Sequence, residues 1–260
     1  MKGISSVALL ALSLSFSVAS AELPAVEGDM TDLAEIDLFD PFADRGEPLK
    51  GGDLDACVDR LARGENRQKV ALAKDGLKRL VAGYRKWPGL GKNKRYGVFV
   101  DYTKNSREKR AFLIDFKSCD VLFSEYVIHG GTTYSPLAFY GDPNRDGLLD
   151  YCRQPNGSRQ YMTRPGVYVT RGCHQTQLKG WPQIYKDCEG IKLEGLEPSN
   201  GDAYRAGVVL HEHEAIPNDA SMKFEGQGCP SMPAGALKPM VPYGLMRGAL
   251  VLLYAPQCDE

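Results

Sequence analysis

Residues 208–233 read VVLHEHEAIPNDASMKFEGQGCPSMP, and this stretch decides which fold and which chemistry we expect. Its beginning is rich in β-branched and apolar residues, which is typical of a strand. Side chains alternate across a strand, so His211 and His213 point to the same face. The chain then turns through residues 226–228 and reaches Cys229, and the two glycines of that turn provide the backbone freedom that a tight turn needs. The sequence therefore predicts a strand with two imidazoles, followed by an accessible thiol.

Cysteine with histidine, without an obligatory metal, is the arrangement used in covalent acyl transfer. His211 would take the thiol proton, Cys229 would attack a carbonyl carbon, and backbone N–H groups would hold the oxyanion. PSMPAGALK, after the cysteine, can begin a helix, whose amides would lower the pKa of the thiol, as would a nearby imidazolium. Two alternatives stay open. The two residues can be functionally unrelated, or His211, His213 and Cys229 can hold zinc, although no fourth ligand is evident at short spacing.

The N-terminal residues 1–21, MKGISSVALLALSLSFSVASA, have the pattern of a signal peptide. Lys2 precedes a short apolar run, and small residues precede the cleavage point. The run is shorter than the roughly 20 residues of a membrane span, and no other stretch could cross a bilayer. The net charge of -1 over 260 residues argues against nucleic acid or an acidic membrane surface as a partner. We therefore expect an exported protein of the periplasm or cell envelope, with no transmembrane segment.

The cysteine count is odd, at seven. An oxidising compartment favours disulfides, so at least one thiol is left over or pairs with another molecule. The other six cysteines can form three disulfides in any of 15 connectivities. Cys229 is the cysteine that we expect to stay unpaired, because the glycine turn before it would leave its thiol accessible to a substrate.

The rest of the chain divides by composition. Residues 22–66 are acidic and contain isolated apolar residues around prolines, which predicts an irregular extension with a short helical turn. Residues 67–87, RQKVALAKDGLKRLVAGYRKW, show helical apolar spacing and predict an amphipathic helix that ends at Pro88. A second, kinked helix is predicted over 234–245. Short segments typical of strands lie between the helices, namely YGVFVDY, RAFLIDF, VLFSEYVI, GVYVTR, GIKLEGL and AGVVLHEHE, and ALVLLYA follows the second helix.

Residues 208–233 resemble the catalytic segment of the L,D-transpeptidase catalytic-domain family, the cysteine enzymes of bacterial cell-wall cross-linking. Members have a strand that ends in His, followed later by Ser-x-Gly-Cys. In a murein-type branch, Pro and a small residue stand between the cysteine and another Pro, as in GCPSMP here. NSREKRAFLIDFKSCDVLFSEYVIHGG resembles the entry strands of that branch, TRPGVYVT resembles the Thr-Pro-x-Gly-x-aromatic strand, and ALVLLYAP resembles the terminal strand. The resemblance covers roughly 68–256 and implies a mainly β sandwich or barrel over 67–260, with one helix before it and one after the cysteine.

The resemblance also implies roles for individual residues. Cys229 would be the nucleophile and His211 the base, with the backbone carbonyl of Glu212 orienting the imidazole. The amides of Gly228 and Cys229 would form the oxyanion hole. His213 is an additional imidazole that would contact substrate or compete as a base. No cofactor is required, and the partners would be peptidoglycan stem peptides.

Three activities fit this resemblance. A transpeptidase would pass the acyl group from the cysteine to an amine of a neighbouring stem, and an L,D-carboxypeptidase would pass it to water. The third hypothesis is a wall-binding module without turnover. It stays open because the chain has Glu212 where the family has Gly or Ser, Gly226 where it has Ser, and Gln227 where it often has His or Trp. His129, in VIHGG, is interpreted as structural or as a wall of the cleft.

Residues 142–153, DPNRDGLLDYCR, resemble a calcium-binding EF-hand loop in their spacing. Four side chains with oxygen ligands occupy loop positions 1, 3, 5 and 9: Asp142, Asn144, Asp146 and Asp150. Arg153 stands at position 12, where a bidentate glutamate is normal. The loop is therefore interpreted either as a site for a structural calcium ion or as a polar surface turn held by Cys152.

Overall fold

The computed structural model describes residues 51–90, 92–131, 140–221 and 225–258. All of them belong to the unit Asp40–Glu260. The predicted signal peptide and the acidic residues as far as 50 lie outside the described residues. No helix of the described part is long and apolar enough to span a membrane.

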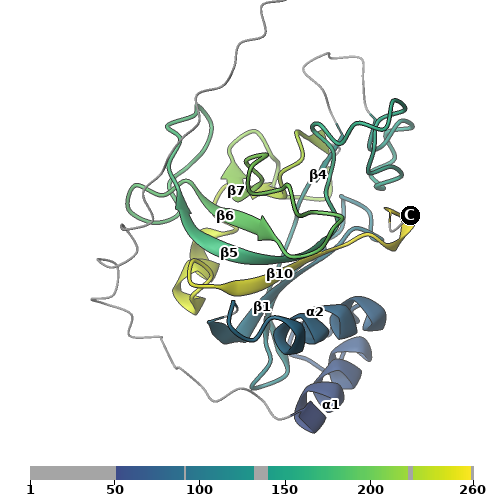
Figure 1. Ribbon diagram of the computed structural model, residues 1–260, viewed down its shortest axis with the longest axis vertical. Coiled ribbons are helices and arrows are strands. Elements are labelled where there is room, and N and C mark those ends of the chain that lie inside the picture. The colour runs from purple at the N-terminus through teal and green to yellow at the C-terminus, as the bar shows by residue number, and fades with distance from the viewer. Residues whose placement is uncertain (1–50, 91, 132–139, 222–224, 259–260) are drawn as a thin grey trace, which may run out of the picture. The chain divides into compact units, whose positions relative to one another are not determined.

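The described strands form an eight-stranded sheet in the order β3-β2-β1-β10-β5-β6-β7-β9 and a small sheet of β4 with β8. The bounds of the strands are β1 Asn93–Asp101, β2 Ala111–Asp115, β3 Asp120–Glu125, β4 His129–Gly130, β5 Gly166–His174, β6 Gly190–Gly195, β7 Val209–His213, β8 Glu225–Gly226, β9 Ser231–Pro233 and β10 Ala249–Tyr254. Figure 1 shows β10, β5 and β6 side by side as long, curved strands. The seven predicted strand segments correspond to seven of these strands. The short strands β4, β8 and β9 were not predicted, because two or three residues show no periodicity.

The large sheet is nearly closed. Its outer strands are β3 and β9, and Ile128, shortly after β3, pairs with Ser231 of β9. The amide of Ile128 donates a hydrogen bond of 2.9 Å to the carbonyl oxygen of Ser231. This contact gives the sheet a barrel-like form and confirms the expected mainly β fold. It also brings the beginning of the VIHGG segment beside the residues that follow Cys229.

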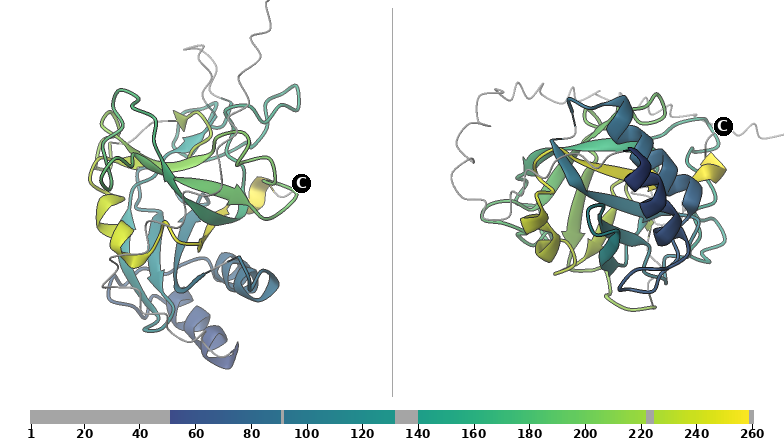
Figure 2. Two further views of the ribbon diagram at one scale, coloured as in Figure 1. Left: turned by 60° about the vertical axis from the view of Figure 1, so that its left-hand side comes forward. Right: turned by 90° about the horizontal axis from the view of Figure 1, so that it is seen from below.

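Two helices precede the sheet and lie on one side of it (Figure 2). The predicted amphipathic helix is present as α2, Lys74–Lys86, and it buries Leu77, Leu80 and Val81. It begins later than expected, because the preceding residues connect it to another helix, α1, which spans Gly51–Ala62. The expectation of an irregular segment with only a short helical turn was wrong for these residues. The helical spacing of its buried apolar residues was overlooked: Leu54, Cys57, Val58 and Leu61.

The helix expected over 234–245 is present only in part. Residues 231–233 form β9, and only Lys238–Tyr243 are helical, as the 3-10 helix η3. Pro239 and Pro242 have no N–H to donate, so the backbone cannot form a continuous α-helix here. A last 3-10 turn, η4, covers Pro256–Cys258.

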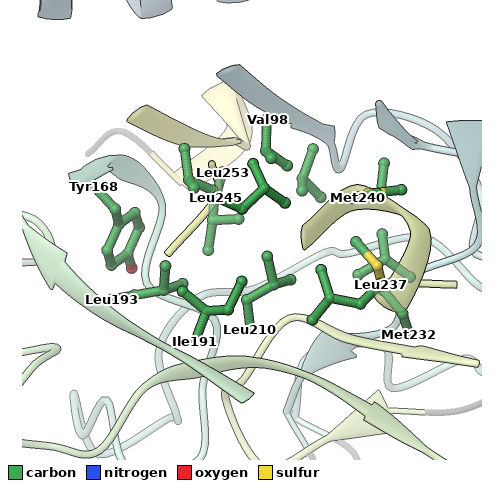
Figure 3. Close-up of a cluster of buried hydrophobic side chains, with 14 of the residues drawn as sticks. Val98, Tyr168, Ile191, Leu193, Leu210, Met232, Leu237, Met240, Leu245 and Leu253 are labelled. Carbon is green, nitrogen blue, oxygen red and sulfur yellow. The ribbon is translucent and has the colours of Figure 1, made fainter. Parts of the chain in front are cut away.

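The core has two layers that share strand β1. Every residue from Tyr96 to Asp101 is buried, because both faces of the strand are covered. Val98 and Val100 point into the barrel with Tyr168, Leu193 and Leu210, and Figure 3 shows part of this cluster. The alternate residue Phe99 packs on the other face with side chains of α1 and α2. The helices therefore stabilise the outer face of the sheet, whereas the barrel interior is filled by its own strands and η3.

Six of the seven cysteines form disulfides: Cys57–Cys119, Cys152–Cys258 and Cys173–Cys188. The first joins α1 to the turn between β2 and β3, so this part of the N-terminal extension is linked covalently to the domain. Cys229 is unpaired. The prediction of three bridges and one remaining thiol is confirmed.

Candidate active site

Cys229 lies in the turn between β8 and β9, with its sulfur against the start of β7. The amide of Val209 donates to Sγ at 3.4 Å, and the thiol donates to the carbonyl oxygen of Gly207 at 3.8 Å. Burial raises the pKa of the Cys229 thiol, while the Val209 amide and the charge of Arg164 act in the opposite direction. The expectation of a lowered pKa was wrong, because a strand and not a helix N-terminus follows the cysteine.

The turn before Cys229 is held by glycine contacts. β4 and β8 pair in parallel, with Gly130 opposite Gly226. Gly228 adopts a φ of 101°, in the region that favours glycine, and a β-carbon on it would lie 3.1 Å from the Met162 carbonyl oxygen. Among the described residues, no hydrogen bond uses the amides of Gly228 or Cys229 as donors. Both amides are therefore available for an oxyanion, as the resemblance implies, and their catalytic role stays a prediction.

His211 is held at both ring nitrogens and is only 5% exposed. Nδ1 lies 2.9 Å from the backbone carbonyl oxygen of Glu212, the contact that the resemblance implies. A carbonyl oxygen can only accept, so Nδ1 carries the proton and Nε2 has the free lone pair. Nε2 accepts a hydrogen bond of 2.6 Å from the hydroxyl of Ser231. Nε2 is therefore the atom of His211 that can take up a proton.

The face of the His211 ring is covered by an indole. The rings of Trp181 and His211 are stacked, with centroids 3.5 Å apart and planes 6° apart. Burial lowers the pKa of His211 to about 3, and the carbonyl of Glu212 opposes this shift only in part. At neutral pH the resting site therefore holds a neutral thiol and a neutral imidazole.

Cys229 lies two residues before the strand partner of His211, but among the described residues the two side chains are not hydrogen-bonded. His211 pairs with Ser231 across β7 and β9, and Cys229 is two residues before Ser231. Within the part of the chain that the structure describes, the thiol contacts Gly207 and Val209, and both nitrogens of His211 contact other groups. A proton transfer between them needs a rotation of the thiol away from Gly207.

The zinc alternative is not supported by this geometry. No group of three or more His, Cys, Asp or Glu side chains in the described ranges is placed to hold a metal ion. Both nitrogens of His211 and the sulfur of Cys229 already contact other protein groups.

The carboxylate of Glu212 is buried and hydrogen-bonded to backbone amides. It is 1% exposed and accepts hydrogen bonds from three backbone amides: Gly235 at 2.7 Å, Leu237 at 2.5 Å and Lys238 at 2.8 Å. Leu210 is in the barrel core, and Glu212 follows on the same face of β7, away from the imidazole of His211. This departure from the family pattern therefore supports the segment that leads into η3 and leaves the carbonyl of Glu212 free to contact His211.

The other two predicted histidines lie in different surroundings. His213 is on the same face of β7 as His211, and its ring packs on Gly180 while its Nδ1 accepts from the amide of Ala215 at 3.0 Å. Its role in substrate binding stays a prediction. His129 is 1% exposed, and its Nδ1 lies 3.0 Å from a guanidinium nitrogen of Arg110. Burial and the charge of Arg110 lower the pKa of His129, which agrees with a structural role.

Sequence reasoning missed Ser231, Trp181 and Arg164. Ser231 stands in the quoted motif GCPSMP, but only the pairing of β7 with β9 places its hydroxyl on His211. Trp181 is in a loop far from His211 in sequence, with no pattern that connects them. Arg164 is part of TRPGVYVT, and it is buried near Gly228.

The predicted calcium loop is stabilised by its own backbone. Asp142 accepts hydrogen bonds from the amides of Asp146 and Gly147, at 3.0 and 2.7 Å. Asn144 and Asp146 likewise accept from amides two residues ahead. Burial, followed by the charges of Asp146 and Asp142, raises the pKa of Asp150. These contacts explain the loop without an ion. No three carboxylates in the described ranges are placed to hold a metal ion, so calcium at this loop stays a prediction without support from the geometry.

Comparison with known proteins identifies the family of the chain. The family model described as "L,D-transpeptidase catalytic domain" matches residues 68–254, most of the chain and all of β1 to β10. No curated protein and no solved structure matches the chain. The mainly β, nearly closed sheet is consistent with the fold of that family. The chain belongs to the L,D-transpeptidase catalytic domain family.

Proposed function

We propose that this protein is an exported cysteine acyltransferase that acts on peptidoglycan stem peptides as an L,D-transpeptidase. Family membership supports the general class, because the family consists of cysteine acyltransferases and peptidases that act on the cell wall. The observation that carries the proposal is Cys229. It is unpaired, whereas the other six cysteines form disulfides, and it lies beside a strand whose histidine has an unprotonated nitrogen, Nε2, which accepts a hydrogen bond from Ser231.

The first step would form a thioester. The thiol of Cys229 loses its proton to Nε2 of His211, and Sγ attacks the amide carbonyl carbon after an L-centre of a tetrapeptide stem. The amides of Gly228 and Cys229 hold the oxyanion. The C–N bond then breaks, and the leaving D-alanine amine takes the proton from His211. The products of this step are the Cys229 thioester and free D-alanine.

The second step would release the acyl group. An amine of a neighbouring stem attacks the thioester carbonyl, a new amide bond forms, and the C–S bond breaks. His211 takes the proton of the attacking amine and returns a proton to the sulfur. The neutral resting pair suits this cycle, because a neutral imidazole can accept a proton at both steps.

Two other functions use the same geometry. If water replaces the amine, the protein is an L,D-carboxypeptidase. If the thiol never reaches Nε2, the protein is a wall-binding module, and the present contacts of the thiol with Gly207 and Val209 are the observation that favours this reading.

One experiment separates the three functions. The purified protein is incubated with a carbapenem and with tetrapeptide stems, and mass spectrometry follows the protein and the products. We expect a covalent adduct on Cys229 together with dimeric stems, and neither with Cys229→Ala. D-Alanine release without dimers would identify the carboxypeptidase. Stem binding without any adduct on the native protein would identify the binding module and contradict the proposal.

Export is the second part of the proposal. The pattern of residues 1–21 and the three disulfides support it, because stable disulfides form in oxidising compartments. N-terminal sequencing of the protein from its native envelope should begin at Glu22. A mature protein that still begins at Met1 would contradict a cleaved signal peptide.

A further inference from the structure

The indole of Trp181 stacks on His211, but neither step of the proposed reaction uses it. The planes of the two rings are 6° apart and their centroids are 3.5 Å apart, which is van der Waals contact. With Nδ1 held by Glu212 and Nε2 held by Ser231, the indole provides a third contact, on the ring face. Rotation of the imidazole about its Cβ–Cγ bond would break all three contacts together.

The position of the indole is determined by the loop that carries it. This loop, residues 175–189, connects β5 to β6, and the disulfide Cys173–Cys188 joins its two ends. The amide of Glu214 donates to the carbonyl oxygen of Gly180 at 2.9 Å, which ties the loop to the end of β7. Gly180 has a φ of 84°, and a β-carbon on it would lie 2.9 Å from Cε1 of His213. Only glycine therefore allows the loop to lie this close to His213.

We propose that Trp181 is a positioning residue, which keeps the imidazole of His211 in the orientation that directs Nε2 toward the cysteine turn and shields the ring from water. An aromatic face also attracts a cation, and tryptophan does so more strongly than phenylalanine or tyrosine. The indole thus lowers the energy of the imidazolium that forms during each proton transfer, while it excludes the water that would otherwise hydrogen-bond to the ring.

Two titratable groups other than the thiol act on His211. The charges of His213 on β7 and of His174 on β5 both lower its pKa when they are present. His174 also lies near Trp181, with ring centroids 5.9 Å apart. Any test must therefore compare variants that leave both histidines in place.

The inference rests on the proposed function, so the test measures acylation of Cys229 by a carbapenem over a range of pH. Trp181→Ala removes the aromatic ring that stacks on His211, and Trp181→Phe keeps an aromatic ring at that position. The chain has one other tryptophan, Trp87, which lies at the end of α2, away from the site, so Trp87→Phe is the matched control. NMR of the histidine ring protons provides a second readout that needs no activity.

We expect Trp181→Ala to acylate at least about tenfold more slowly, since a mispositioned base loses much of the 10²–10⁴-fold that general-base catalysis contributes. Its acid limb should move to higher pH, because water reaches the ring and the pKa of His211 rises toward its ordinary value. Burial is the largest influence on this pKa, so its relief outweighs the lost attraction between the indole and the imidazolium. Trp181→Phe should recover most of the rate, and Trp87→Phe should equal the native protein. In the native protein the His211 ring protons should be shifted upfield by the indole, and this shift should vanish in Trp181→Ala.

Each other outcome is informative. Equal rates and equal acid limbs for the native protein and Trp181→Ala overturn the inference alone. So does a slow Trp181→Ala whose acid limb has not moved, because that result marks a role in folding only. Absence of the upfield shift in the native protein also overturns it. If the native protein forms no adduct at all, the proposed function and this inference fail together.

Discussion

Gly130 and Gly228 are in such close contact that a β-carbon on Gly130 would lie 2.5 Å from the α-carbon of Gly228 and 2.7 Å from its nitrogen. Backbone atoms cannot move aside as a flexible side chain can, so the turn before Cys229 depends on glycine at a position far away in sequence. The hydrogen bond of 2.6 Å from the Gly130 amide to the Thr163 hydroxyl holds the other side of this contact.

Gly130→Ala should therefore displace the cysteine turn and lower the rate of acylation by about 100-fold, the scale on which a shift of roughly 1 Å acts in an active site. Mass spectrometry of the carbapenem adduct over time measures this rate. Gly52→Ala is the matched control, because a β-carbon there meets no atom within 4 Å. Native-like acylation of Gly130→Ala would show that the turn tolerates the displacement.

Glu212→Ala should lower the free energy of unfolding by about 3 kcal/mol, because three backbone amides near η3 lose a buried carboxylate acceptor. Urea denaturation followed by circular dichroism measures this change. Glu214→Ala removes an exposed carboxylate two residues later and should change stability by less than about 0.5 kcal/mol. Equal stabilities of the two variants would argue against a structural role for the Glu212 carboxylate.

The stability of the protein should fall in acid partly because of His211. Its pKa in the folded protein, about 3, is below the ordinary value of 6.5. Above pH 6.5 His211 is neutral in both the folded and the unfolded protein, so it does not change the free energy of unfolding. As the pH falls from 6.5 toward 3, the unfolded chain binds a proton that the folded protein does not bind, so the free energy of unfolding decreases.

At about pH 4.5 this contribution amounts to roughly 3 kcal/mol. Chemical denaturation near pH 7.5 and pH 4.5 should show a smaller loss for His211→Gln than for the native protein. His129, whose pKa is also lowered by burial, contributes the same loss to both proteins and so cancels in the comparison. An identical loss in both proteins would contradict the burial of a neutral His211.

Calcium at the 142–153 loop is tested by removing it. A structural ion would relieve the repulsion among Asp142, Asp146 and Asp150, so EDTA should lower Tm by a few degrees and excess Ca²⁺, but not Mg²⁺, should restore it. Asp146→Asn should abolish the response. A Tm that is the same with and without EDTA would remove calcium and leave the loop as a turn held by its backbone hydrogen bonds.

Much of the fold could be predicted from local patterns. The seven longer strands and α2 have apolar periodicities that their burial in one core requires, and the odd cysteine count pointed to a remaining thiol. The helix α1 had an equally clear spacing of buried residues that the acidic composition around it obscured. The short strands β4, β8 and β9 could not be predicted, because their conformation comes from partners on other strands.

The candidate site shows the same division. Cys229 and His211 could be named from their residue types and their setting, and the carbonyl contact of Glu212 followed from the family resemblance. The direction of the pKa shift of the thiol could not be predicted in the same way. A lowered thiol pKa was expected from a helix N-terminus, but two prolines prevent that helix and burial dominates. The partners Ser231 and Trp181 come from a paired strand and from a disulfide-closed loop.

The sequence alone determined which atoms can do chemistry here: one thiol without a partner, two imidazoles on one face of a strand, and a glycine turn that can expose amides. Only the tertiary structure decided how those atoms stand in the resting protein, with the thiol turned to Gly207, Nε2 bonded to Ser231 and the indole of Trp181 over the ring. The reason is physical. Residue type and alternation are local properties of the chain, whereas burial, stacking and hydrogen-bond partners depend on segments that meet only when the sheet closes.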